Sequence, residues 1–419
     1  MGFVLSVVAL MPVALTGHSS AGGAHDVATN SLLYHLVAAA LWVGGLVALL
    51  THLSRRGDHG GLACARYSRL ALICWIVMAA SGVINALVRV TPDKLLTTYG
   101  LLVLGKVAAL LVLGVIGWQH RRGAVAAVAE RDDRRAVLRL GSVELLVMFA
   151  TIGLAVALSR TTAPGGIAAQ PSCTEVFLGY NLNGPPTPAR LLLHWRPDLV
   201  FGGAALVLAG VYLAGVRRLW RRGDGWPVGR TVAWLGGCAI ILLATSSGLG
   251  RYSMAMFSVH IAAHMLLSMV APILLVLGAP VTLALRALPV AGAGNPPGAR
   301  EWLLTFLHSW VMRIAMHPLL VLSTYVGSFY VMYLAGLYDA AAPSHGAHLV
   351  MNANFLLVGY MYYWLIVGVD PAPRRLPYPG KLGLLLAAMP RPQSRTRRRL
   401  RAGDLQRANG PVGAAPRRP

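Results

Sequence analysis

Apolar runs long enough to cross a membrane recur along this chain of 419 residues, and they constrain its fold more than any other feature. A helix needs about 20 apolar residues to cross about 30 Å of hydrocarbon. Such runs lie near residues 31–53, 67–90, 99–118, 140–159, 196–216, 231–248, 255–277, 318–338 and 348–369, with weaker candidates at 3–16 and 381–389. The sequence therefore predicts an all-α fold, a polytopic transmembrane helix bundle of about ten spans.

The composition agrees with a chain surrounded by membrane lipid. Charged residues make up only 12% of the sequence, and the mean hydropathy is +0.61. A water-soluble domain of this size carries far more charge on its surface. We therefore predict a multi-pass protein of the cell membrane, meaning the inner or plasma membrane.

The placement of basic residues predicts how the chain crosses the membrane, because short cytoplasmic loops carry an excess of Lys and Arg. Basic clusters follow every second apolar run: Arg55, Arg56, Arg66 and Arg69; then Arg121, Arg122, Arg131, Arg134, Arg135 and Arg139; then Arg217, Arg218, Arg221, Arg222 and Arg230; then Arg286, Arg300 and Arg313; then Arg374, Arg375 and Lys381. The loops near 18–30, 91–98, 160–195, 249–254 and 339–347 should face outward. The net charge of +23 follows mainly from this topology, so no nucleic-acid partner is expected.

Two histidines lie four residues apart in the apolar run from Met254 to Leu277. Positions i and i+4 share a helix face, so His260 and His264 project together, and Met256 lies one turn earlier. Polar groups in hydrocarbon are costly and usually functional. Two imidazoles and a thioether suit a soft or borderline cation such as copper. The pattern leaves a metal site and a hydrogen-bonded packing role open.

Other histidines are placed by the same topology. His348 begins its run from the outer side, with Asn352 four residues later, and we expect it to approach the His260/His264 pair across a helix–helix contact. His35 lies near the outer end of its run, and a lone histidine there is more typical of packing. Histidines on the Arg-rich side are expected to be interfacial or loop residues: His52, His59, His120, His308 and His317.

Two further ionisable residues lie in apolar runs. Lys106 is expected to extend its ammonium group outward to the interface, rather than to line a polar pathway beside His35. Glu144 is expected to reach water or the Arg-rich loop, with no catalytic part.

The cysteines show no CxxC spacing, which argues against a thiolate site: they are Cys64, Cys74, Cys173 and Cys238. No Ser/His/Asp arrangement, nucleotide loop or pair of carboxylates is evident, so no enzyme is predicted.

Chain breakers divide the sequence into two parts. The segment from Ser159 to Arg196 contains several prolines and glycines and is the longest predicted outer connection. We predict a membrane module at 1–160, an extracytoplasmic loop at 161–195, a second membrane module at 196–390 and an Arg-rich tail at 391–419. The tail cannot bury a core and is predicted to be disordered. We interpret its abrupt start as a frameshift or truncation rather than a basic regulatory segment.

Several segments resemble known families. The first module, with YHLVAAALWVGGLVAL at 34–49 and YGLLVLGKVAALLVLGVIGWQHRR at 99–122, resembles the copper-resistance protein CopD family. The second resembles the CtaG family of cytochrome c oxidase assembly proteins. Its matching segments are HIAAHMLLSMVAPILLVLGAPVTLALRAL at 260–288, HPLLVLSTYVGSFYVMYL at 317–334 and HLVMNANFLLVGYMYYWLIVGVDPAPRRLPYP at 348–379. Such fusions are familiar in actinobacteria.

The resemblance implies copper handling. The first module would transport copper or confer copper resistance, and the second would deliver copper during oxidase maturation, with oxidase subunits or a copper chaperone as partners. The histidines carried over are His35 in the first module and His260, His264 and His348 in the second. Family members often have histidine where Asn352 or Asn354 stands, so this chain completes its site differently.

The residues and the resemblance together predict a copper ion, as Cu(I) if methionine takes part. Neutral imidazoles of His260 and His264 would hold it, with His348 or Met256 as a third ligand, and release it by ligand exchange. One alternative is a b-type haem in an electron-transfer bundle, although axial ligands approach iron from opposite sides, whereas His260 and His264 share a helix. Another is a structural membrane partner with no ligand.

Overall fold

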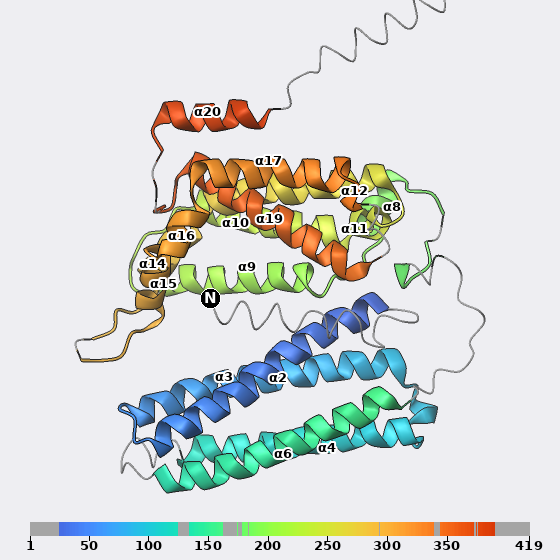
Figure 1. Cartoon of the computed structure of the whole chain (residues 1–419), viewed down its shortest axis with the longest axis vertical. Coiled ribbons are helices and arrows are strands. Elements are labelled where there is room, and N and C mark those ends of the chain that lie inside the picture. The colour runs from blue at the N-terminus through green and yellow to red at the C-terminus, as the bar shows by residue number, and fades with distance from the viewer. Residues whose placement is uncertain are drawn as a thin grey trace, which may run out of the picture.

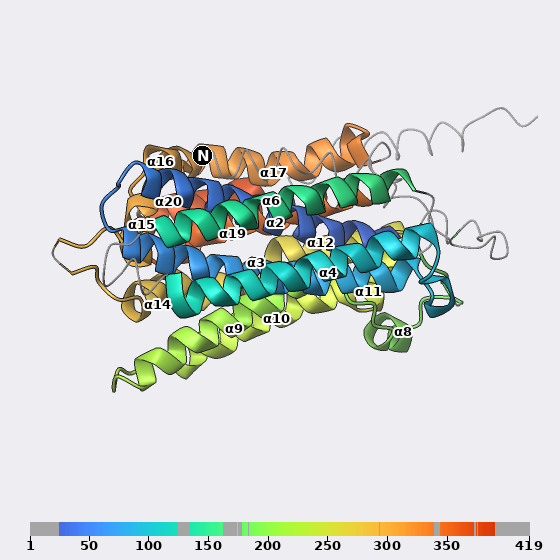
Figure 2. The same cartoon turned by 90° about the horizontal axis from the view of Figure 1, so that it is seen from below.

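The computed structural model describes residues 25–124, 134–161, 174, 178–182, 184–292, 294–338, 344–372, 374 and 376–389, and in this part of the chain the regular elements are all helices. The long helices run side by side along one axis and form two bundles (Figures 1 and 2). The predicted segment 3–16, Cys173 and the predicted tail at 391–419 lie outside the described residues. The all-α bundle expected from the apolar runs is confirmed.

The first bundle contains four long helices. They are α2 (His25–Ser54), α3 (Gly60–Arg89), α4 (Thr98–Gln119) with its π-helical continuation η3 (His120–Ala124), and α6 (Arg134–Arg160). The short 3-10 turn η2 (Pro92–Lys94) connects α3 to α4. Trp42, Leu46 and Met148 are buried between these helices, whereas residues such as Leu87, which is 77% exposed, face outward. An apolar exterior of this kind is suited to lipid.

The second bundle surrounds a helix that is interrupted by one π-helical turn. Its long elements are α9 (Phe201–Trp220), α10 (Val228–Ser246), α12 (Phe257–Met265) continuing through η4 (Leu266–Val270) into α13 (Ala271–Leu277), α17 (Pro318–Leu334) and α19 (His345–Val367). Short helices close its ends: α8 (Pro188–Leu193), α11 (Gly248–Ser253), α14 (Pro280–Ala287), α15 (Ala299–Leu307) and α16 (Trp310–Ala315). Helix α20 (Tyr378–Ala388) lies on the outside (Figure 1).

Eight helices in the described part of the chain are long and apolar enough to cross a membrane. They account for eight of the nine strong predicted runs. The ninth is α17, which is apolar but has 17 residues. Helix α20 has 11 residues, or about 16 Å of rise, so it is too short to cross alone. The protein is therefore a multi-pass membrane protein with somewhat fewer full-length spans than predicted.

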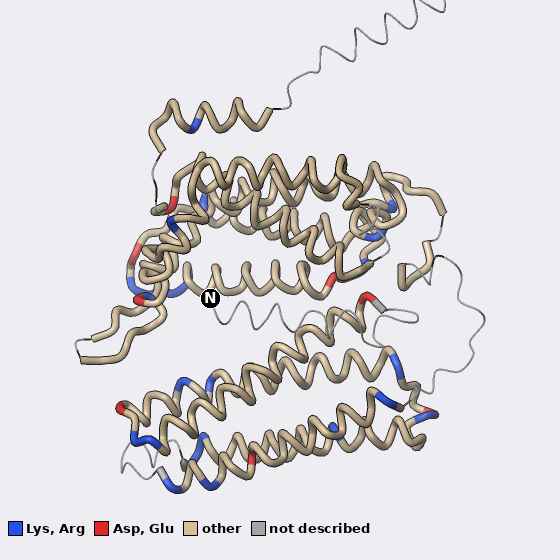
Figure 3. Tube along the Cα trace, viewed as in Figure 1, with Lys and Arg blue, Asp and Glu red and all other residues tan. Residues whose placement is uncertain are grey.

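Most Lys and Arg residues lie at one end of the helices, and fewer lie at the opposite end (Figure 3). The ends of α2, α4 and α9 and the starts of α3 and α6 bring the predicted Arg-rich loops together (Figure 3). At the opposite end lie α8, α11 and the first turns of α12 and α19 (Figure 1). The alternation of basic loops in the sequence thus becomes two chemically different ends in the structure.

Contacts between the bundles are concentrated at that opposite end. The Arg196 guanidinium donates two hydrogen bonds to the Asp26 carboxylate, Nε to Oδ2 and Nη2 to Oδ1, both at 2.7 Å. The Tyr34 hydroxyl of α2 donates to the Leu199 carbonyl at 3.0 Å. At the basic end, Arg66 donates to the Pro297 carbonyl at 3.1 Å. The bidentate geometry of the Asp26–Arg196 pair gives the junction directional specificity.

Asp370 fixes the start of α14 from a distant part of the sequence. It is 4% exposed, and its carboxylate accepts hydrogen bonds from the backbone N–H groups of Val281 (3.0 Å) and Thr282 (2.8 Å) and from the Thr282 hydroxyl (2.6 Å). A carboxylate at a helix N-terminus satisfies N–H groups that have no partner within the helix. The carboxylate therefore holds the segment after α19 against α14.

We expect Asp370→Ala to destabilise the protein by about 3 kcal/mol, because it leaves buried donors without an acceptor. Thermal unfolding of the detergent-purified protein measures this change. Asp370→Asn is the matched control, since its amide oxygen still accepts a hydrogen bond, and it should lose less. An Asp370→Ala variant that melts with the wild type would contradict the capping role.

Candidate metal site

A local break in the long helix of the second bundle shapes the candidate site. Pro272 lies in the first turn of α13 and has no N–H, so it cannot bond the carbonyl of Ser268 in the α-helical pattern. The helix widens into the π-helical turn η4 just before it, and the Ser268 hydroxyl donates to the His264 carbonyl at 2.7 Å. Such π turns occur often at functional sites. Here it lies directly after the two histidines of α12.

The structure brings His260, His264 and His348 together. They are 1%, 2% and 6% exposed. The ring centroids of His260 and His264 are 4.0 Å apart, and those of His260 and His348 are 5.5 Å apart with perpendicular rings. The first two come from one face of α12 and the third from the first turn of α19, as expected from the i,i+4 spacing and the topology. The rings point into the bundle rather than toward lipid.

Hydrogen bonding separates these histidines into two kinds. His264 is engaged at both nitrogens: Nδ1 lies 2.7 Å from the Tyr333 hydroxyl of α17 and Nε2 lies 3.0 Å from Oδ1 of Asn352 in α19. The amide oxygen only accepts, so Nε2 carries the proton and Nδ1 accepts from tyrosine. In this tautomer the Nδ1 lone pair accepts the Tyr333 hydroxyl, so His264 has no free lone pair for a metal. The packing role that the sequence left open therefore describes His264 well.

His260 and His348 differ from His264 in having unused nitrogens. His348 Nδ1 donates to the Ser344 carbonyl at 3.2 Å, which leaves Nε2 as the nitrogen with a lone pair. That Nε2 and both ring nitrogens of His260 are buried without a hydrogen-bond partner among the described residues. The Ser253 backbone approaches His260 without forming a hydrogen bond of ordinary geometry. Buried nitrogens in this state are suited to a ligand or ordered water.

No preformed chelate of three His, Cys, Asp or Glu side chains exists within the described residues. The predicted set of His260, His264 and His348 is thus close in space but is not arranged as a closed metal centre. Two imidazoles with available lone pairs remain, His260 and His348. Such a pair can hold a soft cation that is to be passed on, whereas structural metal sites are usually closed by four ligands.

The structure places the predicted thioether of Met256 apart from the cavity beside the histidines. Met256 precedes α12 with an extended backbone and is 36% exposed, and it does not line the cavity beside the histidines. Met254, two residues earlier, does line it. The i,i+4 spacing placed Met256 on the histidine face, but α12 begins only at Phe257, so helical spacing does not extend back to Met256.

His35 lies in the first bundle and is not brought to the other predicted ligands. Its Nδ1 lies 2.8 Å from the Ser81 hydroxyl of α3, and Lys106 of α4 is close enough to act on it electrostatically. Asn85 continues the polar contacts by donating to the Ser31 hydroxyl at 2.6 Å. His35 thus belongs to a separate polar group between α2 and α3, with Lys106 half-buried beside it.

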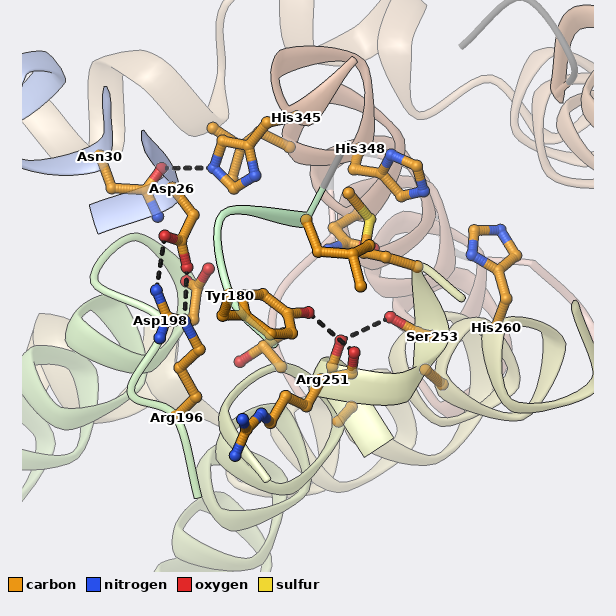
Figure 4. A pocket seen from close by; sticks show the side chains of 18 of the residues that line it. Asp26, Asn30, Tyr180, Arg196, Asp198, Arg251, Ser253, His260, His345 and His348 are labelled. Atoms are coloured by element: carbon orange, nitrogen blue, oxygen red, sulfur yellow. Dashed lines mark hydrogen bonds and ion pairs between the residues drawn. The ribbon is translucent and has the colours of Figure 1, made fainter. Parts of the chain in front are cut away.

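The histidines line a cavity of about 80 Å³ at the junction of the two bundles (Figure 4). This volume is enough for a few water molecules or an ion. Asp26 and Asn30 of α2 contribute one wall, and Arg196, Tyr180 and His345 also line the cavity. His345 Nε2 lies 2.9 Å from Oδ1 of Asn30. No local pattern indicated this wall from the first module, because Asn30 and His345 are 315 positions apart.

Four charged side chains line the cavity, and three of them are held by close partners. Asp26 and Arg196 form the bidentate pair, and the Tyr180 ring lies under the guanidinium groups of Arg196 (4.5 Å) and Arg251 (5.3 Å). The fourth is Asp198, which precedes α9. Burial raises the pKa of the Asp198 carboxyl, backbone N–H groups at the start of α9 oppose this rise, and the neighbouring Asp26 adds to it.

Glu144 and His120 correct two expectations. Glu144 is 2% exposed and faces the interior of the first bundle, not water or the Arg-rich loop. It accepts a hydrogen bond from the Trp42 indole at 3.2 Å, and its Oε2 lies 3.2 Å from Nε2 of His120, whose side chain is 12% exposed. His120 is therefore not an interfacial loop residue. Polar side chains on neighbouring helices satisfy a carboxylate inside a membrane bundle. The residue pattern of one helix does not identify these partners.

The chain was compared with known protein families. Residues 61–158 match copper resistance protein D, and residues 210–392 match the cytochrome c oxidase caa3 assembly factor family. The first match covers α3, α4 and α6, and the second runs from within α9 to beyond α20. The fusion of the two families that the sequence motifs predicted is therefore confirmed, while the exact module boundaries stay a prediction.

Relatives along most of the chain occur in mycobacteria. Uncharacterized protein MT0111 of Mycobacterium tuberculosis (strain CDC 1551 / Oshkosh) is 41% identical over 406 residues, which is 92% of this chain and 57% of that protein. Uncharacterized protein ML1998 of Mycobacterium leprae is 39% identical over 390 residues, with 92% and 56% covered. Inner membrane protein YebZ of Escherichia coli is 30% identical over 141 residues, with 32% and 49% covered. The chain thus spans less than two thirds of these relatives, and no solved structure matches it.

Proposed function

We propose, from the premise that this chain joins a copper resistance protein D segment to a caa3 assembly factor segment, that it is an integral membrane copper-handling protein acting in copper resistance and cytochrome c oxidase assembly. In this proposal His260 and His348 hold one copper ion, which passes to an oxidase subunit or a copper chaperone by ligand exchange. The supporting observation is that two buried imidazoles from different helices lie with their ring centroids 5.5 Å apart and have nitrogens with no hydrogen-bond partner among the described residues.

The residues around this pair have separate roles in the proposal. His348 is oriented by its hydrogen bond to Ser344, which leaves Nε2 without a hydrogen-bond partner among the described residues. His264 is a positioning residue: Tyr333 and Asn352 hold it, and its ring packs at 4.0 Å against His260. Outer partners of this kind orient metal ligands and raise affinity. Met254 is the thioether available to the same cavity, which favours Cu(I) as the cargo.

The proposed site opens on the extracytoplasmic side. Basic residues gather at the other end of the bundles (Figure 3), and short basic loops remain in the cytoplasm. His260 and His348 lie in the first turns of α12 and α19, which start from the end that lacks these clusters. His35 stays a separate candidate for copper passage through the first segment. No covalent step belongs to this proposal, and the protein is proposed not to be an enzyme.

Metal analysis of the detergent-purified full chain tests the proposal. We expect about one Cu(I) per chain when the protein is loaded under reducing conditions, and none retained in a His260→Ala/His348→Ala double variant. A visible absorption spectrum of the same preparation tests the haem alternative, since bound b-type haem gives a Soret band. Copper retained equally by both proteins would reject the site, and a protein that binds neither copper nor haem would support a ligand-free structural partner.

A further inference from the structure

The cavity contains one carboxylate that no basic side chain neutralises. Asp26 is fully engaged by Arg196. Asp198 has no Lys, Arg or His within ion-pair distance among the described residues; its Oδ1 accepts the Phe201 backbone N–H at 2.5 Å. Asp198 lies beside the Asp26–Arg196 pair and lines the same cavity as His260 and His348 (Figure 4). The Asp198 carboxylate is half-buried, and backbone N–H groups satisfy its oxygens without neutralising its negative charge, so it can still attract a cation.

The pair His260 and His348 lacks the negative charge that a bound cation requires. Neutral imidazoles coordinate a cation but supply no negative charge, and a cation in a site of low dielectric requires one nearby. Arg251 adds a positive charge to the cavity lining, and its guanidinium group donates to the Asn181 carbonyl at 2.8 Å and lies over Tyr180. Among the described residues that line the cavity, Asp198 is thus the one carboxylate available to balance a bound cation.

We propose that Asp198 is the counter-ion for a soft monovalent cation in this cavity, so that the cation's positive charge is balanced where the two bundles meet. This inference rests on the proposed function and names the carboxylate that balances the charge of the bound cation. The Asp26–Arg196 pair then has a defined effect: it keeps a second carboxylate from attracting the cation. Removing either charge must change cation affinity, and in opposite directions.

Silver ion is the probe, because it is a soft monovalent cation that is not redox-active under these conditions. We expect Asp198→Asn in the full-length purified protein to weaken Ag⁺ binding by about tenfold, the size of one Coulomb interaction across a partly buried site. The amide keeps an oxygen for the Phe201 N–H. Asp93→Asn, which removes an exposed carboxylate on the η2 turn outside the cavity, is the matched control and should leave affinity unchanged.

Arg196→Gln gives the opposing measurement. It frees the Asp26 carboxylate and is expected to strengthen Ag⁺ binding, whereas general damage to the junction would weaken binding in both variants. Opposite changes in the two variants support the counter-ion; equal or same-direction changes overturn it. Ag⁺ binding that depends on His260 but not on Asp198 rejects this inference alone, and absence of Ag⁺ binding by the wild type rejects the proposed function as well.

Discussion

We expect His260→Ala to weaken Cu(I) binding by more than 100-fold, because it removes one of two available ligands. Loss of a residue that only orients a metal ligand lowers metal affinity by about 10- to 100-fold. His348→Ala should have the same effect. Asn352→Ala should fall in the smaller range, because it frees one nitrogen of His264 without removing a ligand. Competition with a chromophoric Cu(I) chelator measures all three affinities.

His308→Ala is the matched control for these variants. His308 is exposed at the basic end, and its Nδ1 donates to the Leu304 carbonyl, so its removal should leave Cu(I) affinity unchanged. Equal losses in His308→Ala and His260→Ala would indicate nonspecific binding to imidazoles. A larger loss in Asn352→Ala than in His348→Ala would reverse the roles given to His264 and His348.

Gly359→Ala is expected to produce a large loss of stability in the second bundle. A Cβ atom at this position of α19 would collide with the Ser268 carbonyl oxygen and lie 3.0 Å from Cγ of Pro272. Both neighbours belong to the interrupted helix, and the carbonyl is backbone that cannot rotate away. Overpacking of a tight contact costs about 1–3 kcal/mol or more. We expect a cost at the upper end of that range, measured as a lower melting temperature in detergent.

The Gly359 contact also sets the distance between the histidines. Displacing α19 from η4 moves His348 relative to His260, so Cu(I) affinity should fall together with stability. Gly327→Ala in α17 is the matched control, because a Cβ there meets nothing within 4 Å, and alanine favours a helix over glycine. Unchanged melting in Gly359→Ala would show that the two helices do not meet as closely as described.

Much of the site followed from local pattern alone. The apolar run around His260 fixed its depth, and i,i+4 spacing fixed the face it shares with His264. The basic loops placed His348 at the same end of the molecule, and its approach to the pair is seen as expected. Helical spacing could not place the Met256 side chain, because α12 begins only after this residue. The position of Glu144 along its helix could not show that the carboxylate turns inward to Trp42 and His120.

The sequence by itself determined that this protein is a helical membrane bundle of two fused family segments, because spans, basic loops and motifs are contiguous in the chain. Tertiary structure alone decided which imidazoles are available. Tyr333 and Asn352, 69 and 88 positions from His264, take up its nitrogens, while the first bundle supplies a wall beside His260 and His348. Hydrogen bonds between helices depend on how the helices pack, and periodicity within one helix carries no record of its neighbours.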